Sequence, residues 1–287
     1  MRIPRHWTKA SYTGRNLEGR ELTFTAWGWS FNGLAAAQDD AQSRARRIFD
    51  CLINGRQPSS YEYSDRPLRE EIIHTMRQDD KDVAVITRNR YGALVLNTAS
   101  VLFVDIDFPR IKPEGWLDAI ALSVSVSRRK QRQAATQELT LQSVRDWSRR
   151  HPNHAFRVYR TYAGLRLLFV DQRYDPSSDR VARILNELGS DPLYRTLTSK
   201  QECFRARLTA KPWRCGTSVP PNQYPWASEE DECSYRAWED RYTQTAEAYK
   251  ACELVESYGE TAGDSEINTV LKMHDDLACA GQDKRLA

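Results

Sequence analysis

The stretch Val101-Leu-Phe-Val-Asp-Ile-Asp107, followed by Phe108 and Pro109, decides the fold that we expect for this chain. Its apolar residues are typical of a buried β-strand, and the strand ends in two carboxylates separated by one residue. Because side chains at positions i and i+2 of a strand point to the same face, Asp105 and Asp107 are expected to project together. Pro109 then ends the strand.

Two carboxylates held this close repel each other unless a cation or a proton lies between them. Mg²⁺ and Mn²⁺ prefer oxygen ligands and usually take part of their coordination shell from a phosphate. The pair therefore predicts a metal site that uses Mg²⁺ or Mn²⁺ and handles a phosphate-bearing substrate. The alternative is a strand that simply ends in polar residues, because Ile106 continues the apolar run between them.

The composition sets broad limits on the class of protein. The chain has 287 residues, enough for one large domain or two small ones, and 40% of them are hydrophobic, which is enough for a core. No stretch resembles a transmembrane span, and the polar and aromatic residues 1–7 do not resemble a signal peptide. We therefore expect a cytoplasmic protein with no membrane partner. The six cysteines show no C-x-x-C pair and no metal-finger spacing, which predicts reduced thiols rather than disulfides or zinc.

The net charge of +3 is distributed unevenly along the chain. Residues 109–216 carry 21 basic against 10 acidic residues, whereas residues 217–287 carry 6 basic against 15 acidic residues. A basic segment of this kind suits a polyanion such as a nucleotide or a nucleic acid. The alternative is that the basic segment docks onto the acidic C-terminal one.

Periodicity predicts the elements that precede the Asp pair. Residues 1–20 have no clear pattern, residues 21–29 alternate as a strand, and residues 34–53 have the spacing of an amphipathic helix. A further helix is expected from Asp65 to about residue 76, because a capping residue and a proline open it. Apolar strands then follow at hairpin spacing, which indicates an antiparallel sheet: residues 83–87, 93–96 and 101–107.

After the Asp pair, residues 109–137 form a basic and partly helical insertion, and residues 137–150 form a helix. Residues 155–160 and 165–171 are predicted to make a hairpin, and residues 202–208 a later strand with basic residues on one face. After a proline-rich stretch at 217–227, the acidic residues 229–257 and 263–279 are expected to form two helices. The predicted organisation has three parts: an N-terminal βα extension packed on the core (1–82), an α+β core (83–216) and an acidic helical segment (217–287).

The order of these elements resembles the catalytic core of the archaeo-eukaryotic primase superfamily, the primase-polymerases. In that family an RRM-like sheet carries a hydrophobic strand ending in Asp-x-Asp, then a Ser-x-His strand, then a third acidic residue. The resemblance covers residues 83–214, and residues 101–107 match the Asp-x-Asp motif. Arg166 stands where the family has its phosphate-contacting histidine, and Asp171 and Asp191 are the choices for the third carboxylate. Residues 203–214 are also similar to a segment of uncharacterised bacterial proteins, which implies no activity.

The resemblance implies an α+β fold with an RRM-like antiparallel or mixed sheet, and a metal-dependent nucleotidyltransferase that acts on nucleoside triphosphates or nucleic acid. Asp105 and Asp107 would be the catalytic pair and would bind the ions, with Asp191 as a further ligand. The ions would bridge the triphosphate and lower the pKa of the attacking 3′-hydroxyl. The phosphates would be neutralised by Arg160, Arg166, Arg205, Arg207 and Lys211. For the arginines, the alternative is ion pairing with the acidic C-terminal helices.

Three other functions compete with this one. A degenerate primase-like module could bind nucleic acid or a protein without catalysis, since the histidine is missing. A haloacid-dehalogenase-like phosphatase also uses Asp-x-Asp, but it needs a small residue and a Thr where Phe108 and Pro109 stand. A nucleotide-sugar glycosyltransferase uses Asp-x-Asp to hold Mn²⁺, but it needs an α/β nucleotide-binding half upstream. The sequence leaves the oligomeric state open.

Overall fold

The computed structural model describes residue 1 and residues 3–55, 67–113, 115–281 and 283–287. The chain is α+β, as predicted, and its strands pair antiparallel except for the two-residue strands β10 (Tyr249–Lys250) and β12 (Arg285–Leu286). The predicted helix start at Asp65 lies outside the described residues. No helix in the described part of the chain is long and apolar enough to cross a membrane.

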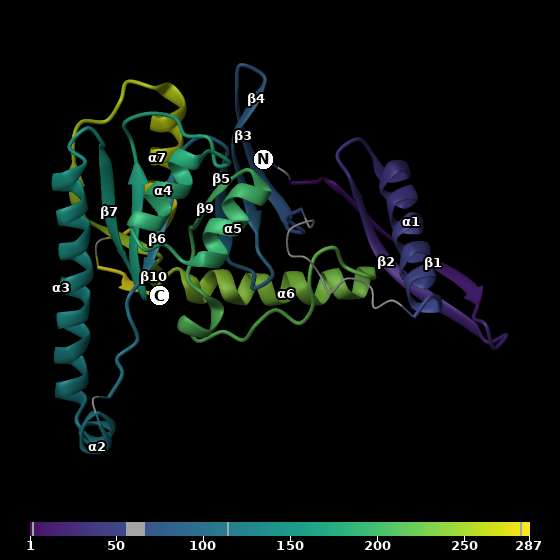
Figure 1. Cartoon of the computed structure of the whole chain (residues 1–287), viewed down its shortest axis with the longest axis horizontal. Coiled ribbons are helices and arrows are strands. Elements are labelled where there is room, and N and C mark those ends of the chain that lie inside the picture. The colour runs from purple at the N-terminus through teal and green to yellow at the C-terminus, as the bar shows by residue number, and fades with distance from the viewer. Residues whose placement is uncertain (2, 56–66, 114, 282) are drawn as a thin grey trace.

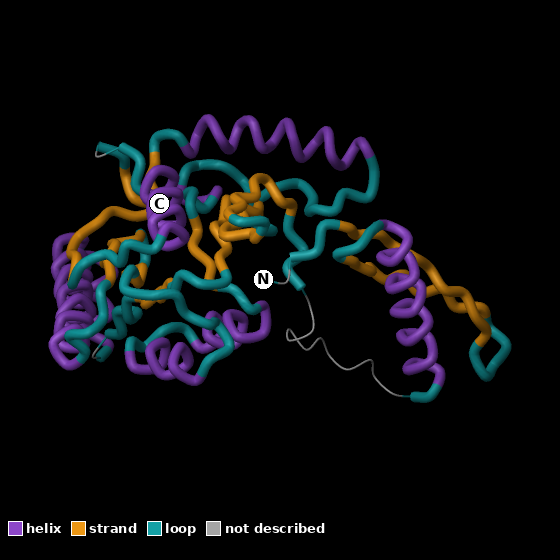
Figure 2. Tube along the Cα trace, turned by 90° about the horizontal axis from the view of Figure 1, so that it is seen from above, coloured by secondary structure: helices purple, strands orange, loops and turns teal. Residues whose placement is uncertain are grey.

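The N-terminal residues form a hairpin covered by one helix. Strand β1 (His6–Arg15) pairs with β2 (Glu21–Ser30), and α1 (Leu34–Ile53) packs across them. Gly28 permits this packing, because a Cβ at that position would lie 2.1 Å from the backbone nitrogen of Ala41. The unit therefore has one strand more than the sequence predicted. Figures 1 and 2 show it to one side of the other elements.

The next sheet has the strand order β3-β4-β5-β9. Its strands are β3 (Glu71–Gln78), β4 (Lys81–Arg88), β5 (Leu94–Thr98) and β9 (Phe204–Arg207). The predicted helix to residue 76 was wrong in its described part, because that segment forms β3 instead. Asp79 and Asp80 explain the difference, since both adopt positive φ (47° and 61°) and close a tight hairpin between β3 and β4.

The strand that carries the Asp pair belongs to a separate sheet, with the order β11-β7-β8-β6. Its strands are β6 (Phe103–Asp107), β7 (Phe156–Thr161), β8 (Gly164–Phe169) and β11 (Cys252–Tyr258). The predicted β7–β8 hairpin is confirmed. The expectation that the Asp strand continues the preceding hairpin was wrong, because β6 pairs with β8.

The two faces of this second sheet are covered differently. Helix α3 (Val126–Arg150) follows α2 (Trp116–Val124) and packs Trp147 against Phe156 and Phe169 on one face. Helix α7 (Ser265–Ala278) covers the opposite face, where His274 lies against Phe103 and Tyr159. Because alternate residues of a strand point to opposite faces, Asp105 and Arg166 share the face that α7 covers.

The acidic C-terminal segment contributes to this same core. Residues 247–257, predicted as helix, contain β10 and the edge strand β11, which pairs with β7. Helix α6 (Glu229–Ala246) packs Tyr235, Trp238 and Tyr242 in a smaller cluster with Ala210 and Cys215. The remaining helical elements are α4 (Asp179–Glu187), α5 (Pro192–Gln201) and the 3₁₀ turn η2 (Pro212–Arg214).

Candidate functional site

Asp105 is held by a buried arginine on the neighbouring strand. Asp105 and Arg166 face each other in the β6–β8 register, and the guanidinium donates to both carboxylate oxygens at 2.8 and 3.3 Å. A third donor of Arg166 bonds the carbonyl oxygen of Arg207 at 2.8 Å. The Arg166 side chain is 4% exposed, whereas that of Asp105 is 40% exposed. Burial lowers the pKa of Arg166, but the attraction of Asp105 outweighs it and raises this pKa above its usual value.

Asp107 lies exposed at the end of the same strand, where the negative charges of Asp105 and Asp191 repel its carboxylate. Its pKa is raised above the usual value by partial burial and then by the charges of Asp105 and Asp191. No hydrogen bond to its side chain is present within the described ranges. Gly164 lies opposite it, and a Cβ there would lie 2.0 Å from the carbonyl oxygen of Ile106. Glycine therefore allows β8 to approach β6 closely at the end where Asp107 projects.

Asp191 reaches this place because the loop before α5 is tied to β6. Ser190 donates to the backbone oxygen of Asp105 at 3.1 Å, and Tyr194 donates to that of Phe103 at 3.0 Å. The Asp191 side chain caps α5 by accepting from the backbone nitrogen of Tyr194 at 2.9 Å. The charge of Asp191, the predicted further ligand, therefore acts on Asp107 and raises its pKa.

Three cations lie beside the carboxylates. Arg207 ends β9, Lys211 precedes η2, and Arg214 ends η2. Burial lowers the pKa of each, and Arg207 falls to about 10. The positive charges also depress one another, since Arg214 acts on both Arg207 and Lys211. Across the residues that the structure describes, neither Lys211 nor Arg214 forms an ion pair with a carboxylate. Arg207 donates to the backbone oxygens of Thr209 and Ala287.

Two other predicted phosphate-binding residues, Arg160 and Arg205, bind other side chains of the protein. Arg205 is partly buried and donates to both oxygens of Glu70 at 2.7 Å. Arg160 lies on the face of β7 opposite to Arg166 and donates to Gln137 at 2.8 Å. Neither arginine is therefore available to the Asp pair. Strand alternation points Arg160 to the opposite face of the sheet, and Glu70 already neutralises Arg205.

Asp171, the other choice for the third carboxylate, is bound in a different cluster. It accepts from Tyr174 at 2.9 Å and lies 2.8 Å from Nδ1 of His154. It is accordingly not the carboxylate that acts on Asp107.

Part of the basic segment does pair with the acidic C-terminal residues. Arg145 binds Glu256, and Arg157 binds Asp275. Arg173 binds both Asp264 and Glu266. The predicted docking of the basic segment onto the C-terminal one thus accounts for these arginines and for the contact of Arg207 with Ala287, whereas it does not account for Lys211 and Arg214.

The carboxylates of Asp105, Asp107 and Asp191, all in the described part of the chain, do not all come within 4.8 Å of one another. Within the described part of the chain, three ligand-bearing side chains come within 4.8 Å of one another only at Cys252, His274 and Cys279. This cluster was missed by the sequence reasoning, because its members are not close in sequence in a finger-like pattern. Arg214 was also missed, although it ends the same basic segment as Lys211.

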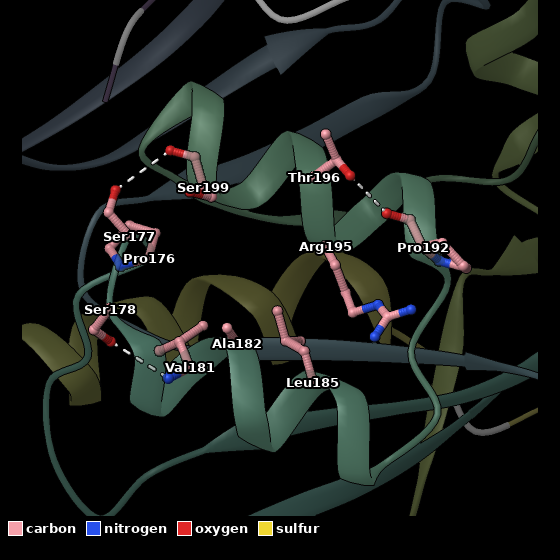
Figure 3. Close-up of a pocket in the computed structure, with 10 residues that line it drawn as sticks. All are labelled: Pro176, Ser177, Ser178, Val181, Ala182, Leu185, Pro192, Arg195, Thr196 and Ser199. Carbon is pink, nitrogen blue, oxygen red and sulfur yellow. Dashed lines mark hydrogen bonds between the residues drawn. The ribbon is translucent and has the colours of Figure 1, made fainter.

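A pocket of about 380 Å³ lies between α4 and α5 (Figure 3). Its lining contains one cation, Arg195, and no carboxylate; the other lining residues include Val181, Leu185 and Ser199. The pocket therefore lacks the donor set of the Asp105–Asp107–Asp191 region. Comparison with known proteins adds no relative: no family model, curated protein or solved structure matches this chain.

Proposed function

We propose that this chain is a metal-dependent nucleotidyltransferase of the primase-polymerase type, acting on nucleoside triphosphates or nucleic acid. One juxtaposition supports the proposal. Asp107 feels the charges of two other carboxylates and lies near two cations, Lys211 and Arg214, which have no ion-pair partner among the described residues. Carboxylates that hold a hard cation, next to cations that hold phosphate, are what a metal-bound triphosphate requires.

The donor set fits Mg²⁺ or Mn²⁺. The raised pKa of Asp107 means that its charged form lacks a sufficient compensating cation, which a divalent ion would supply. Since the three carboxylates, all within the described ranges, do not meet within 4.8 Å, the ion would be held by one or two of them together with phosphate oxygens. A bound ion would supply charge neutralisation and a lowered pKa for an attacking hydroxyl.

Each residue of the proposed site would have its own role in binding the ion, the phosphates or the base. Asp107 and Asp191 would bind the ion, and Asp105 would share its charge between the ion and Arg166. Lys211 and Arg214 would neutralise the phosphates, because no carboxylate in the described ranges competes for them. Tyr162 is 53% exposed, and the Arg214 guanidinium carbon lies over one face of its ring, 4.1 Å from the centroid, so a base would stack on the opposite face.

Calorimetric titration of Mn²⁺ tests the proposal, with and without a nucleoside triphosphate. We expect the triphosphate to tighten Mn²⁺ binding in the wild type, and the Asp107→Asn variant to lose that tightening. Asp39→Asn is the matched control, because Asp39 is exposed on α1 and far along the chain from the site. A wild type that binds neither ligand, or a variant that binds both normally, would contradict the proposal.

The second candidate is a primase-like module that binds nucleic acid without catalysis. The Asp105–Arg166 pair favours it, because Asp105 is already neutralised within the protein. Salt-sensitive binding of single-stranded DNA that is unchanged in Asp107→Asn, with no Mn²⁺ effect, would select this function. The phosphatase and glycosyltransferase alternatives are not favoured, since they need strands separated by helices and β6 pairs antiparallel with β8 of a hairpin.

A further inference from the structure

Two thiols and an imidazole converge on the α7 side of the second sheet. Sγ of Cys252 lies 3.4 Å from Sγ of Cys279 and 3.7 Å from Nε2 of His274. All three ligand atoms lie within 4.8 Å of one another. Cys252 begins β11, His274 lies in the last turns of α7, and Cys279 caps that helix. Three separate backbone positions thus direct soft ligands at one point.

The histidine is oriented as a metal ligand would be. Its Nδ1 lies 3.0 Å from the Asp275 carboxylate, which leaves Nε2 directed at the cysteines. Metal-binding histidines usually donate their second ring nitrogen to a carboxylate or carbonyl in this way. Asp275 is itself fixed by Tyr159 at 2.7 Å and Arg157 at 2.9 Å. Phe103 and Tyr159 hold the ring from the sides, so its position is set by packing as well.

We propose that Cys252, His274 and Cys279 form a binding site for a thiophilic divalent cation of the zinc class. A tetrahedral ion with bonds of about 2.3 Å to sulfur and about 2.0 Å to nitrogen places two sulfurs roughly 3.8 Å apart and a sulfur and a nitrogen roughly 3.5 Å apart. The distances of 3.4 and 3.7 Å therefore need to change by only a few tenths of an ångström.

The ion would join the C-terminal elements to the sheet. Cys252 and His274 are fully buried, whereas Cys279 is partly exposed, so the ion would enter from the Cys279 side. Three protein ligands leave the fourth tetrahedral position for water or another small ligand. Bound metal would fasten the end of α7 to β11, two elements that lie on either side of a loop.

This site is independent of the carboxylate site. It uses soft sulfur and nitrogen ligands rather than hard oxygen ligands, so the two sites select different ions. Asp107→Asn is expected to leave the cysteine site intact, and loss of the cysteine site is expected to leave Mn²⁺ binding at Asp107 intact. Failure of either proposal can therefore be told apart from failure of the other.

The test is Co²⁺ titration of the full chain, freed of metal and kept in a reductant that does not bind metal. We expect one equivalent of Co²⁺ to give thiolate-to-cobalt charge-transfer absorption, and Zn²⁺ to displace it. Cys279→Ser should abolish the absorption, and Asp275→Asn should weaken Co²⁺ binding by about 10- to 100-fold. The control is Cys233→Ser, whose thiol is exposed on α6 and outside the cluster.

A folding readout accompanies the titration, because Cys279→Ser changes the end of a packed helix. Circular dichroism should show a folded Cys279→Ser variant whose thermal midpoint no longer rises when Zn²⁺ is added, in contrast to the wild type. The proposal is overturned if the reduced wild type gives no thiolate-to-cobalt absorption. It is equally overturned if Cys279→Ser retains that absorption, or if Cys233→Ser loses it.

Discussion

Asp105 and Asp107 are neighbours in one motif, yet their removal should affect stability in different ways. Asp105→Ala leaves the Arg166 guanidinium, which is 4% exposed, without its carboxylate and with only one bond to the Arg207 carbonyl. Breaking a buried ion pair by removing one partner costs about 3–5 kcal/mol. Asp107→Ala removes an exposed carboxylate whose negative charge is repelled by Asp105 and Asp191, so we expect the free energy of unfolding to change by no more than about 0.5 kcal/mol.

The measurement is urea unfolding of both variants and the wild type at pH 7, monitored by far-UV circular dichroism. With a slope of about 2–3 kcal/mol per molar urea, Asp105→Ala should lower the midpoint by roughly 1–2.5 M. Asp107→Ala should leave the midpoint unchanged or raise it slightly. Adding Arg166→Met to Asp105→Ala should recover part of the loss, since it removes the stranded charge. Equal midpoints for the two single variants would refute this reasoning.

Three further outcomes follow from the same contacts. Lys211→Ala should weaken triphosphate binding at least severalfold in the presence of Mn²⁺ without lowering the thermal midpoint. The control is Lys272→Ala, which removes an exposed ion pair with Asp276 on α7. Trp147→Ala should cost about 3–5 kcal/mol in urea unfolding, because its 1% exposed ring fills the core under the sheet. Burial raises the pKa of Asp275, but hydrogen bonds from its neighbours outweigh this and lower the pKa below its usual value. Its stabilisation is therefore full above the unfolded pKa of about 3.9 and is lost as the pH falls through the folded value, so Asp275→Asn should flatten the acid limb of a stability profile.

Local patterns predicted the elements whose signals are short-range. The Asp strand and the β7–β8 hairpin follow from apolar runs, alternation and a glycine-containing turn within a few positions. The partner of β6 could not be predicted in this way. Asp105 pairs with Arg166, 61 residues later, and only the assembled sheet brings them together.

Two errors have a common cause. The segments that form β3 and β11 mix apolar with polar and charged residues and lack the apolar density of a buried strand. Both are strands at the edge of their sheets, where one side is unpaired and polar residues are tolerated. A capping residue with a proline in one case, and an acidic composition in the other, therefore favoured helices where pairing within the sheet was the deciding contact.

The candidate site was predicted in part. Motif spacing points to Asp105 and Asp107, whereas the resemblance to the primase-polymerases implies Asp191, Arg207 and Lys211. The occupation of Arg205 by Glu70 depends on a contact across 135 residues, which no local pattern encodes. The same holds for the Cys252–His274–Cys279 cluster, which forms only when α7 packs against the start of β11.

The most direct test of the proposed carboxylate site is a crystal structure of the protein with Mn²⁺ and a non-hydrolysable nucleoside triphosphate. Anomalous scattering would locate the ion independently of the protein density. We predict an anomalous peak roughly 2.1 Å from a carboxylate oxygen of Asp107, with the phosphates held by Lys211 and Arg214. A triphosphate bound elsewhere, or an Asp107 carboxylate with no ion beside it, would contradict the account.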